Sequence, residues 1–374
     1  MSALYIWRAM GLIPFLAQTR HPGRGLRAVR FSSVLTFRGL MENLLSSLAL
    51  TVLIGILALV AQWSRKNRMA EISLLIVLAF VSLLLLATGM LLGAVWIWGQ
   101  APPGVQKLLA VSSLPIVASG LAGLALCFPT LRKIVRREPN GVFWTNPPIF
   151  FGLWMFVTVL LSNNLIGILG FEQLNQIDAF SLGTGGRISP VTVLASQLPF
   201  IVLAVVGVGA VIRRTPRETL ARLGYGPISI RNVGVVVLFI GGAFALSVAA
   251  DYLFSVLQPD LYRKVGEVSG TLFNPKGLSL VSAVLFALLI GVGAGLGEET
   301  LFRGAVQPVF GIPATSILFA SMHVQYGPSL LLGYIFVLSV GLGLLRRYFN
   351  TTTSFLAHAG YNTLGILAAY FFGL

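Results

Sequence analysis

The chain has 374 residues, of which 56% are hydrophobic and only 10% are charged, and its mean hydropathy is +0.89. Soluble globular proteins carry roughly 25% charged residues, so this composition excludes that class. The formal charge of +15 is not concentrated in a basic stretch with interleaved aromatic residues, so it does not indicate a nucleic-acid partner. Basic residues kept in cytoplasmic loops beside anionic membrane lipids explain it instead.

Residues 1–40 form a basic N-terminal segment that holds arginines and no acidic residue. Three interpretations fit this segment. It is an interfacial amphipathic helix, a presequence of the arginine-rich and acid-poor kind, or the flank of a membrane span that the hydropathy pattern hides.

Long apolar runs follow, and about 20 such residues are enough to cross the hydrocarbon core of a bilayer. The fold class predicted is all-α: a polytopic transmembrane helical bundle with about 8–10 membrane helices. We expect these helices near 41–63, 72–98, 108–129, 148–170, 188–212, 233–257, 278–309, 313–326, 328–349 and 353–373. Residues 41–187 form an N-terminal transmembrane region of unassigned function.

The loops between these runs differ in charge. Basic residues gather after the first, third and fifth runs, which the positive-inside rule assigns to the cytoplasm. The loop after the fifth run includes Thr215–Pro227, whose pattern predicts a short surface helix. Pro216 suits its first turn, and Gly224 or Gly226 suits its end.

The ionisable residues of the last hundred positions form three groups inside apolar runs, where each costs roughly 2.5–3.5 kcal/mol on insertion scales. They are Glu298–Arg303, Phe319–His323 and His358–Asn362. In a helix, Glu299 and Arg303 lie on one face and can pair, which leaves Glu298 unpaired. His358 and Asn362 are also four residues apart and share a face. Gly293 and Gly297, which lie just before Glu298, predict a small-xxx-small packing face.

Two chemistries fit these groups. In the first, Glu298 and His323 activate a water while His358 and Asn362 stabilise the oxyanion that forms at an attacked amide. In the second, Glu298, His323 and His358 hold a divalent metal such as zinc, which acidifies the water. The H-E-x-x-H motif is missing, so the second has weaker support. Each group alone also has a purely structural interpretation. Glu299 and Arg303 form a buried ion pair, His323 hydrogen-bonds to a backbone carbonyl, and His358 and Asn362 make polar contacts between helices.

Together the three groups resemble the CAAX protease and bacteriocin-processing family, also called the Abi or type II CAAX prenyl endopeptidase family. The family pattern is a double glutamate with an arginine, then phenylalanine and histidine, then histidine and asparagine. The matching residues are Glu298, Glu299, Arg303, Phe319, His323, His358 and Asn362. The motif core is 278–370, and a linker like the one at 217–224 extends the CAAX-protease-like transmembrane domain to 188–374.

The resemblance implies an intramembrane endopeptidase, with Glu298, His323, His358 and Asn362 as catalytic residues and Glu299, Arg303 and Phe319 as supporting ones. Family members in eukaryotes cleave prenylated C-a-a-X proteins. Arginine predominates over lysine here, which is typical of GC-rich bacterial genomes, so we expect a bacterial plasma membrane. The substrate expected is an undefined peptide or membrane protein, and a prenylated one is the alternative that the resemblance implies. The alternatives are a non-catalytic immunity or scaffold protein and, with less support, a proton-coupled transporter.

Overall fold

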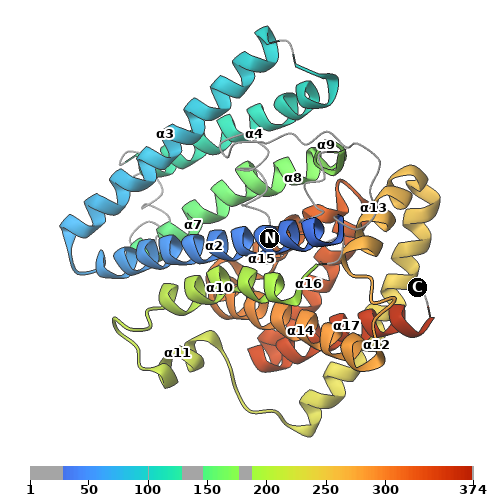
Figure 1. Ribbon diagram of the computed structural model, residues 1–374. Coiled ribbons are helices and arrows are strands. Elements are labelled where there is room, and N and C mark those ends of the chain that lie inside the picture. The colour runs from blue at the N-terminus through green and yellow to red at the C-terminus, as the bar shows by residue number, and fades with distance from the viewer. Residues whose placement is uncertain (1–27, 100, 129–145, 177–187, 373–374) are drawn as a thin grey trace.

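The computed structural model describes residues 28–99, 101–128, 146–176 and 188–372, and for 28–40 it describes the backbone only. Within these ranges the chain forms helices and no strand (Figure 1). Eight of the described helices are long and apolar enough to cross a membrane. The prediction of an all-α polytopic bundle is confirmed. Most of residues 1–40 lie outside the described part, as do the interpretations made for them.

The N-terminal helices are α2 (Ala28–Trp63), α3 (Arg68–Trp98), α4 (Pro103–Cys127), α7 (Pro147–Val159), the π-helical η1 (Leu160–Leu165), α8 (Ile166–Leu169) and α9 (Phe171–Gln176). Helix α2 begins at Ala28, earlier than residue 41, the start that the hydropathy pattern predicts. Helices α3 and α4 pack closely along their length, because glycines let the two backbones approach. A Cβ on Gly89 would lie 2.6 Å from the amide nitrogen of Val117, and one on Gly120 would lie 2.5 Å from that of Leu86.

The C-terminal helices are α10 (Pro190–Gly207), α11 (Pro216–Leu223), α12 (Ile230–Leu257), α13 (Pro259–Leu272), α14 (Leu280–Glu298), the π-helical η2 (Glu299–Val306), α15 (Gln307–Ser321), the 3₁₀ turn η3 (Val324–Tyr326), α16 (Leu330–Tyr348) and α17 (Thr351–Phe372). The amphipathic helix α13 is not among the predicted helices. The run expected as one helix over 278–309 changes to π-helical geometry at Glu299, and the next break falls at Gly311, whose φ is +78°.

Helix α11 forms as its sequence predicts. Pro216 occupies the first turn, and Thr215 and Glu218 form a reciprocal capping box. The hydrogen bond from the Thr215 backbone holds the pKa of the Glu218 carboxyl below its usual value. Gly224 ends the helix in the left-handed conformation, with φ of 78°, which glycine adopts without a Cβ penalty.

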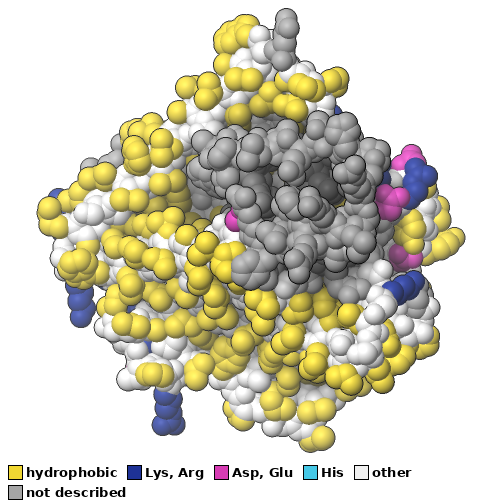
Figure 2. Space-filling view, in the orientation of Figure 1, with side chains coloured by type: hydrophobic (Ala, Val, Ile, Leu, Met, Phe, Trp, Pro, Cys, Tyr) yellow, Lys and Arg dark blue, Asp and Glu magenta, His cyan; other side chains and the backbone are white. Residues whose placement is uncertain are grey.

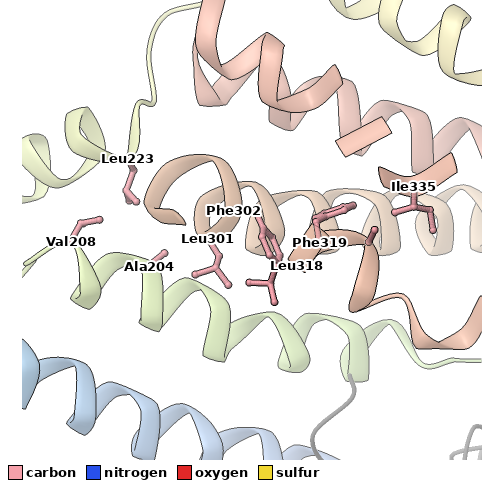
Figure 3. Packing of buried hydrophobic residues seen from close by; sticks show 9 residues of the cluster. Ala204, Val208, Leu223, Leu301, Phe302, Leu318, Phe319 and Ile335 are labelled. Atoms are coloured by element: carbon pink, nitrogen blue, oxygen red, sulfur yellow. The ribbon is translucent and has the colours of Figure 1, made fainter. Parts of the chain in front are cut away.

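Helix α10 joins the two halves of the bundle, because it packs against α2 on one side and against α14 and η2 on the other. The hydrophobic cluster beside it contains Ala204 of α10, Val208 just after that helix, Leu301 and Phe302 of η2, and Phe319 of α15 (Figure 3). Phe302 meets the ring of Phe319 edge-on, with 5.2 Å between centroids. This apolar cluster therefore forms one wall behind the helices that carry the ionisable motifs.

The surface has the distribution expected of a membrane protein. One face is covered with hydrophobic side chains over most of its described area, and the Lys, Arg, Asp and Glu side chains visible there lie mainly near its edges (Figure 2). Large exposed apolar residues occur along α2, α3 and α12, the helices expected to meet lipid. The protein is an integral, multi-pass membrane protein.

The glycines of α14 face two different helices. A Cβ on Gly293 would lie 2.8 Å from Leu194 of α10, and Gly297 faces Gln197 on the same helix, so the predicted packing face is confirmed. Gly291 and Gly295 lie against α17 instead. A Cβ on Gly291 would be 2.8 Å from the carbonyl oxygen of Ala359.

We expect Gly291→Ala to destabilise the protein by about 1–3 kcal/mol, because the added methyl group meets backbone atoms of α17 that cannot move aside. Gly242→Ala in α12 is the matched control, since nothing lies within 4 Å of its Cβ position. Thermal unfolding in detergent, followed by size-exclusion chromatography with fluorescence detection, measures both. Equal melting temperatures for the two variants would contradict the close approach of α14 and α17.

Candidate active site

Glu299, at the start of η2, is fully buried and is the centre of a polar network. Its Oε1 atom lies 3.1 Å from Nη1 of Arg303 and 2.9 Å from Nδ1 of His358. Its Oε2 accepts a hydrogen bond from the hydroxyl of Ser354. Glu299 therefore connects η2 to α17 through two side chains of the latter helix.

Arg303 is also completely buried. Its Nη2 donates hydrogen bonds to the carbonyl and the hydroxyl oxygens of Ser339 on α16, at 3.2 and 3.0 Å. Its guanidinium carbon lies 4.5 Å from the centroid of the Phe319 ring, which is the geometry of a cation–π contact. The Glu299–Arg303 pair predicted from the four-residue spacing is confirmed, although the segment is π-helical there.

His358 is oriented by this network toward Glu298. Because a carboxylate oxygen accepts hydrogen bonds, the Nδ1 atom of His358 carries a proton, and this N–H donates a hydrogen bond to Glu299. The opposite ring nitrogen, Nε2, lies 4.0 Å from Oε2 of Glu298. The side chain of Glu298 is 17% exposed and makes no ion pair with Arg303 among the described contacts, so its carboxylate is the unpaired one, as predicted.

His323 lies just after the end of α15, and its ring is fixed by the backbone. Its Nδ1 is 2.9 Å from the carbonyl oxygen of Phe319, so Nδ1 carries the proton and Nε2 of the neutral ring keeps a lone pair. The ring of Phe319 lies 4.9 Å from that of His323 and 5.8 Å from that of His358, so it contacts both histidines. Within the described contacts, His358 and not His323 is the histidine at ion-pair distance from Glu298.

Asn362 lies one turn after His358 on α17 and is half-buried. Within the described part of the chain, its amide makes no hydrogen bond to another residue. The neighbouring Tyr361 is held by a 2.6 Å hydrogen bond between its hydroxyl and that of Tyr334 on α16. The amide of Asn362 is therefore available to a ligand.

The residues expected for a metal site do not fit one as they stand. Among the described residues, no group of three His, Cys, Asp or Glu side chains converges in a way that could hold a metal ion. Zinc sites in proteins need three or four such ligands at about 2.0–2.3 Å from the ion. Glu298 and His358 are close enough to be two ligands, but His323 does not complete the set.

Three supporting residues were not predicted from the sequence. Ser354 donates a hydrogen bond to Glu299, and Ser339 accepts one from Arg303. The ring of Tyr326 stacks parallel to that of His323, with 6.2 Å between centroids. A sequence signal exists for the first of these: Ser354, His358 and Asn362 are spaced by four residues and share one face of α17. No comparable spacing marks the other two, which come from separate elements.

A further contact that the sequence did not predict links the N-terminal half of the chain to the site. Asn164, in the π-helical η1, donates a 2.8 Å hydrogen bond to the hydroxyl of Ser321, two residues before His323. Asn163 donates in turn to the amide oxygen of Asn164. The end of α15 is therefore supported by residues from the region whose function the sequence left unassigned.

Fold and site together define a polytopic membrane protein with a cluster of ionisable side chains inside its helical bundle. Residues 280–364 match the family model described as type II CAAX prenyl endopeptidase Rce1-like. This match confirms the family resemblance over α14 to α17, includes all seven motif residues, and supports a CAAX-type intramembrane protease. Comparison of the chain with curated proteins and with solved structures gave no match.

Proposed function

We propose that the protein is an intramembrane endopeptidase that hydrolyses an amide bond of a membrane-associated peptide or protein, with Glu298 as the general base. The observation that carries the proposal is the unpaired carboxylate of Glu298, 4.0 Å from a histidine that a buried carboxylate orients. A separation of 4.0 Å is too long for a direct hydrogen bond, and one oxygen atom placed beside both groups can hydrogen-bond to each of them.

In this mechanism, Glu298 takes one proton from a water as the water oxygen attacks the scissile carbonyl carbon. The lone pair on Nε2 of His323 accepts a hydrogen bond from the second O–H of that water and so orients the water. The proton on Glu298 then passes to the nitrogen of the leaving amine as the C–N bond breaks. Both histidines that act with Glu298 are held through Nδ1, His323 by the Phe319 carbonyl oxygen and His358 by Glu299, and such positioning favours general acid–base catalysis.

The oxyanion is stabilised by His358 and Asn362. When His358 carries protons on both ring nitrogens, Nδ1–H donates to Glu299 and Nε2–H points toward Glu298 and the reacting atoms. The charges of Glu298, Glu299, Arg303 and His358 then sum to zero, which suits an interior of low dielectric constant. The unbonded amide of Asn362 supplies a second donor from the same helix face.

The substrate that we propose is an unprenylated peptide or membrane protein in a bacterial plasma membrane. A prenylated C-terminal peptide is the alternative that the family implies. A metal-dependent mechanism with Glu298, His323 and His358 as ligands of zinc has less support, because among the described residues no three such side chains are grouped closely enough to hold a metal ion. Binding without catalysis, as in an immunity or scaffold protein, would not require an oriented histidine beside an unpaired carboxylate.

We expect Asn362→Ala to lower kcat by about 10²- to 10³-fold with little change in KM, because the lost donor acts on the oxyanion and not on the bound substrate. Purified protein in detergent is incubated with farnesylated and unmodified membrane peptides, and the products are identified by mass spectrometry. Asn274→Ala, in the loop between α13 and α14, is the control and should match wild type.

The same assay separates the alternatives. Turnover that is unchanged after treatment with EDTA favours the direct glutamate–histidine route, and its loss with recovery on adding zinc favours the metal route. Cleavage of the farnesylated peptides alone would replace the proposed substrate class. If no peptide is cleaved while labelled peptides still bind, the binding-only alternative is favoured.

A further inference from the structure

A large cavity lies between the N-terminal helices and the Rce1-like region. Its volume is about 510 Å³, within the range of roughly 300–1,000 Å³ that is usual for ligand pockets. Its walls come from α2, α7 and α10 on one side and from η2 and α15 on the other. The lining is mostly apolar and includes Ile54, Phe151, Met155, Leu203, Phe302 and Val309.

This cavity is not the candidate active site. Glu298, Glu299, His323 and His358 do not line it. It lies on the side of η2 that carries Leu301, Phe302 and Val306, and the Phe302–Phe319 contact lies between it and the two histidines. Figure 3 shows Leu301 and Phe302 of this side pointing from η2 toward α10. A ligand here would therefore be additional to the peptidase substrate.

One end of the cavity carries four guanidinium groups, from Arg65, Arg213, Arg214 and Arg222. Their described hydrogen bonds go to neutral acceptors: Arg65 to Asn146, Arg213 to Gln62, and Arg222 to the carbonyl oxygen of Gly304. Among the described residues, no carboxylate forms an ion pair with any of the four, and the nearby Glu218 is bonded to Thr215. Glu218 interacts electrostatically with Arg214 without forming an ion pair, so the cluster keeps a net positive charge.

These arginines are close enough to repel one another. Arg213 lies outside the membrane-spanning helices, and its pKa is lowered to about 10 by burial together with the positive charges of Arg214, Arg65 and Arg222. A bound anion would relieve that repulsion, and arginine binds phosphate oxygens through paired N–H groups. The charged end lies at loops that the positive-inside rule assigns to the cytoplasmic side.

We propose that this cavity binds an anionic phospholipid, with an acyl chain along the apolar walls and the phosphate among Arg65, Arg213, Arg214 and Arg222. An apolar tail and an anionic head on one molecule match the two chemically different ends of the cavity. Lipid of this charge is abundant at the cytoplasmic surface of membranes. The site gives the N-terminal helices α2 and α7 a role that is separate from peptide cleavage.

The test uses the full-length protein in nanodiscs that contain equal amounts of phosphatidylglycerol and phosphatidylcholine. After transfer to detergent and purification, retained lipid is measured by native mass spectrometry. Wild type should retain phosphatidylglycerol at least about tenfold over phosphatidylcholine, since one decade is about 1.4 kcal/mol and several arginine contacts to phosphate exceed that. Arg65→Gln/Arg213→Gln should lose this preference, and the control Lys66→Gln/Arg217→Gln, which removes the same charge outside the cavity lining, should keep it.

A second variant tests the apolar part. Gly152 lines the cavity, and a Cβ there would meet only ring carbons of Phe310, at 3.8 Å, so Gly152→Leu should fill the space and reduce retention of both lipids. Gly242→Leu in α12, where the added Cβ meets nothing within 4 Å, should retain lipid like wild type. Equal retention of the two lipids by wild type, an unchanged preference in Arg65→Gln/Arg213→Gln, or undiminished retention in Gly152→Leu would overturn the proposal. Inorganic phosphate at millimolar concentration should not displace the lipid, because it lacks the tail; displacement would show a simple anion site.

Discussion

Glu298→Gln is expected to abolish peptide cleavage, with a fall in kcat of about 10²- to 10⁴-fold, the usual contribution of a positioned general base. The amide that replaces the carboxylate is nearly the same size but cannot take a proton from water. The fold should be retained, because within the described structure the Glu298 carboxylate makes no closer ion pair than its 4.0 Å contact with His358.

Single-turnover cleavage of the best peptide, measured on detergent-purified protein of matched monodispersity, gives the rate. Asp260→Asn is the control, because Asp260 is an exposed carboxylate whose ion pair in the described structure is with Arg263 on the same helix, α13. If Glu298→Gln cleaves within a few-fold of wild type, Glu298 is not the base and the peptidase mechanism fails. A rise in KM with unchanged kcat would instead assign Glu298 to substrate binding.

Arg303→Met is expected to destabilise the protein by about 3–5 kcal/mol, which is the usual cost of leaving one member of a buried ion pair without its partner. The substitution keeps an apolar stem of similar length but removes the charge beside Glu299, and both side chains are 0% exposed. Glu299 also orients His358, so cleavage should fall with stability. Equilibrium unfolding in mixed micelles of dodecyl maltoside and dodecyl sulfate measures the change.

Two variants make this result specific. Lys264→Met removes a shorter pair, 2.6 Å from Glu172, but both of its members are more than 40% exposed, so the expected loss is below about 1 kcal/mol. Lys264 and Lys107 lower the pKa of Glu172, so this small contribution is present at neutral pH and is lost as the pH falls through that lowered value.

Glu299→Gln/Arg303→Met should be less unstable than Arg303→Met, because it no longer buries an unpaired charge. Equal losses for Lys264→Met and Arg303→Met would contradict the argument.

The sequence by itself determined the class of fold and the chemistry of the motifs. Continuous uncharged runs of more than 20 residues cross lipid as helices, which satisfy their own backbone hydrogen bonds, so an all-α membrane bundle followed from composition. The Glu299–Arg303 pair followed from the spacing within one helix. It survives the change to π-helical geometry because both side chains are long enough to meet across one turn.

Local spacing did not predict the contacts between helices. That His358 approaches Glu298 within 4.0 Å, that Ser339 binds Arg303, and that Asn164 supports Ser321 all depend on how α14, α16, α17 and η1 pack. The cavity with its arginine end is likewise formed by residues between 47 and 322 that share no sequence motif. Side-chain periodicity fixes which residues share a helix face, whereas the distance between faces of different helices is set by small residues and packing across the whole bundle, and only the tertiary structure decides it.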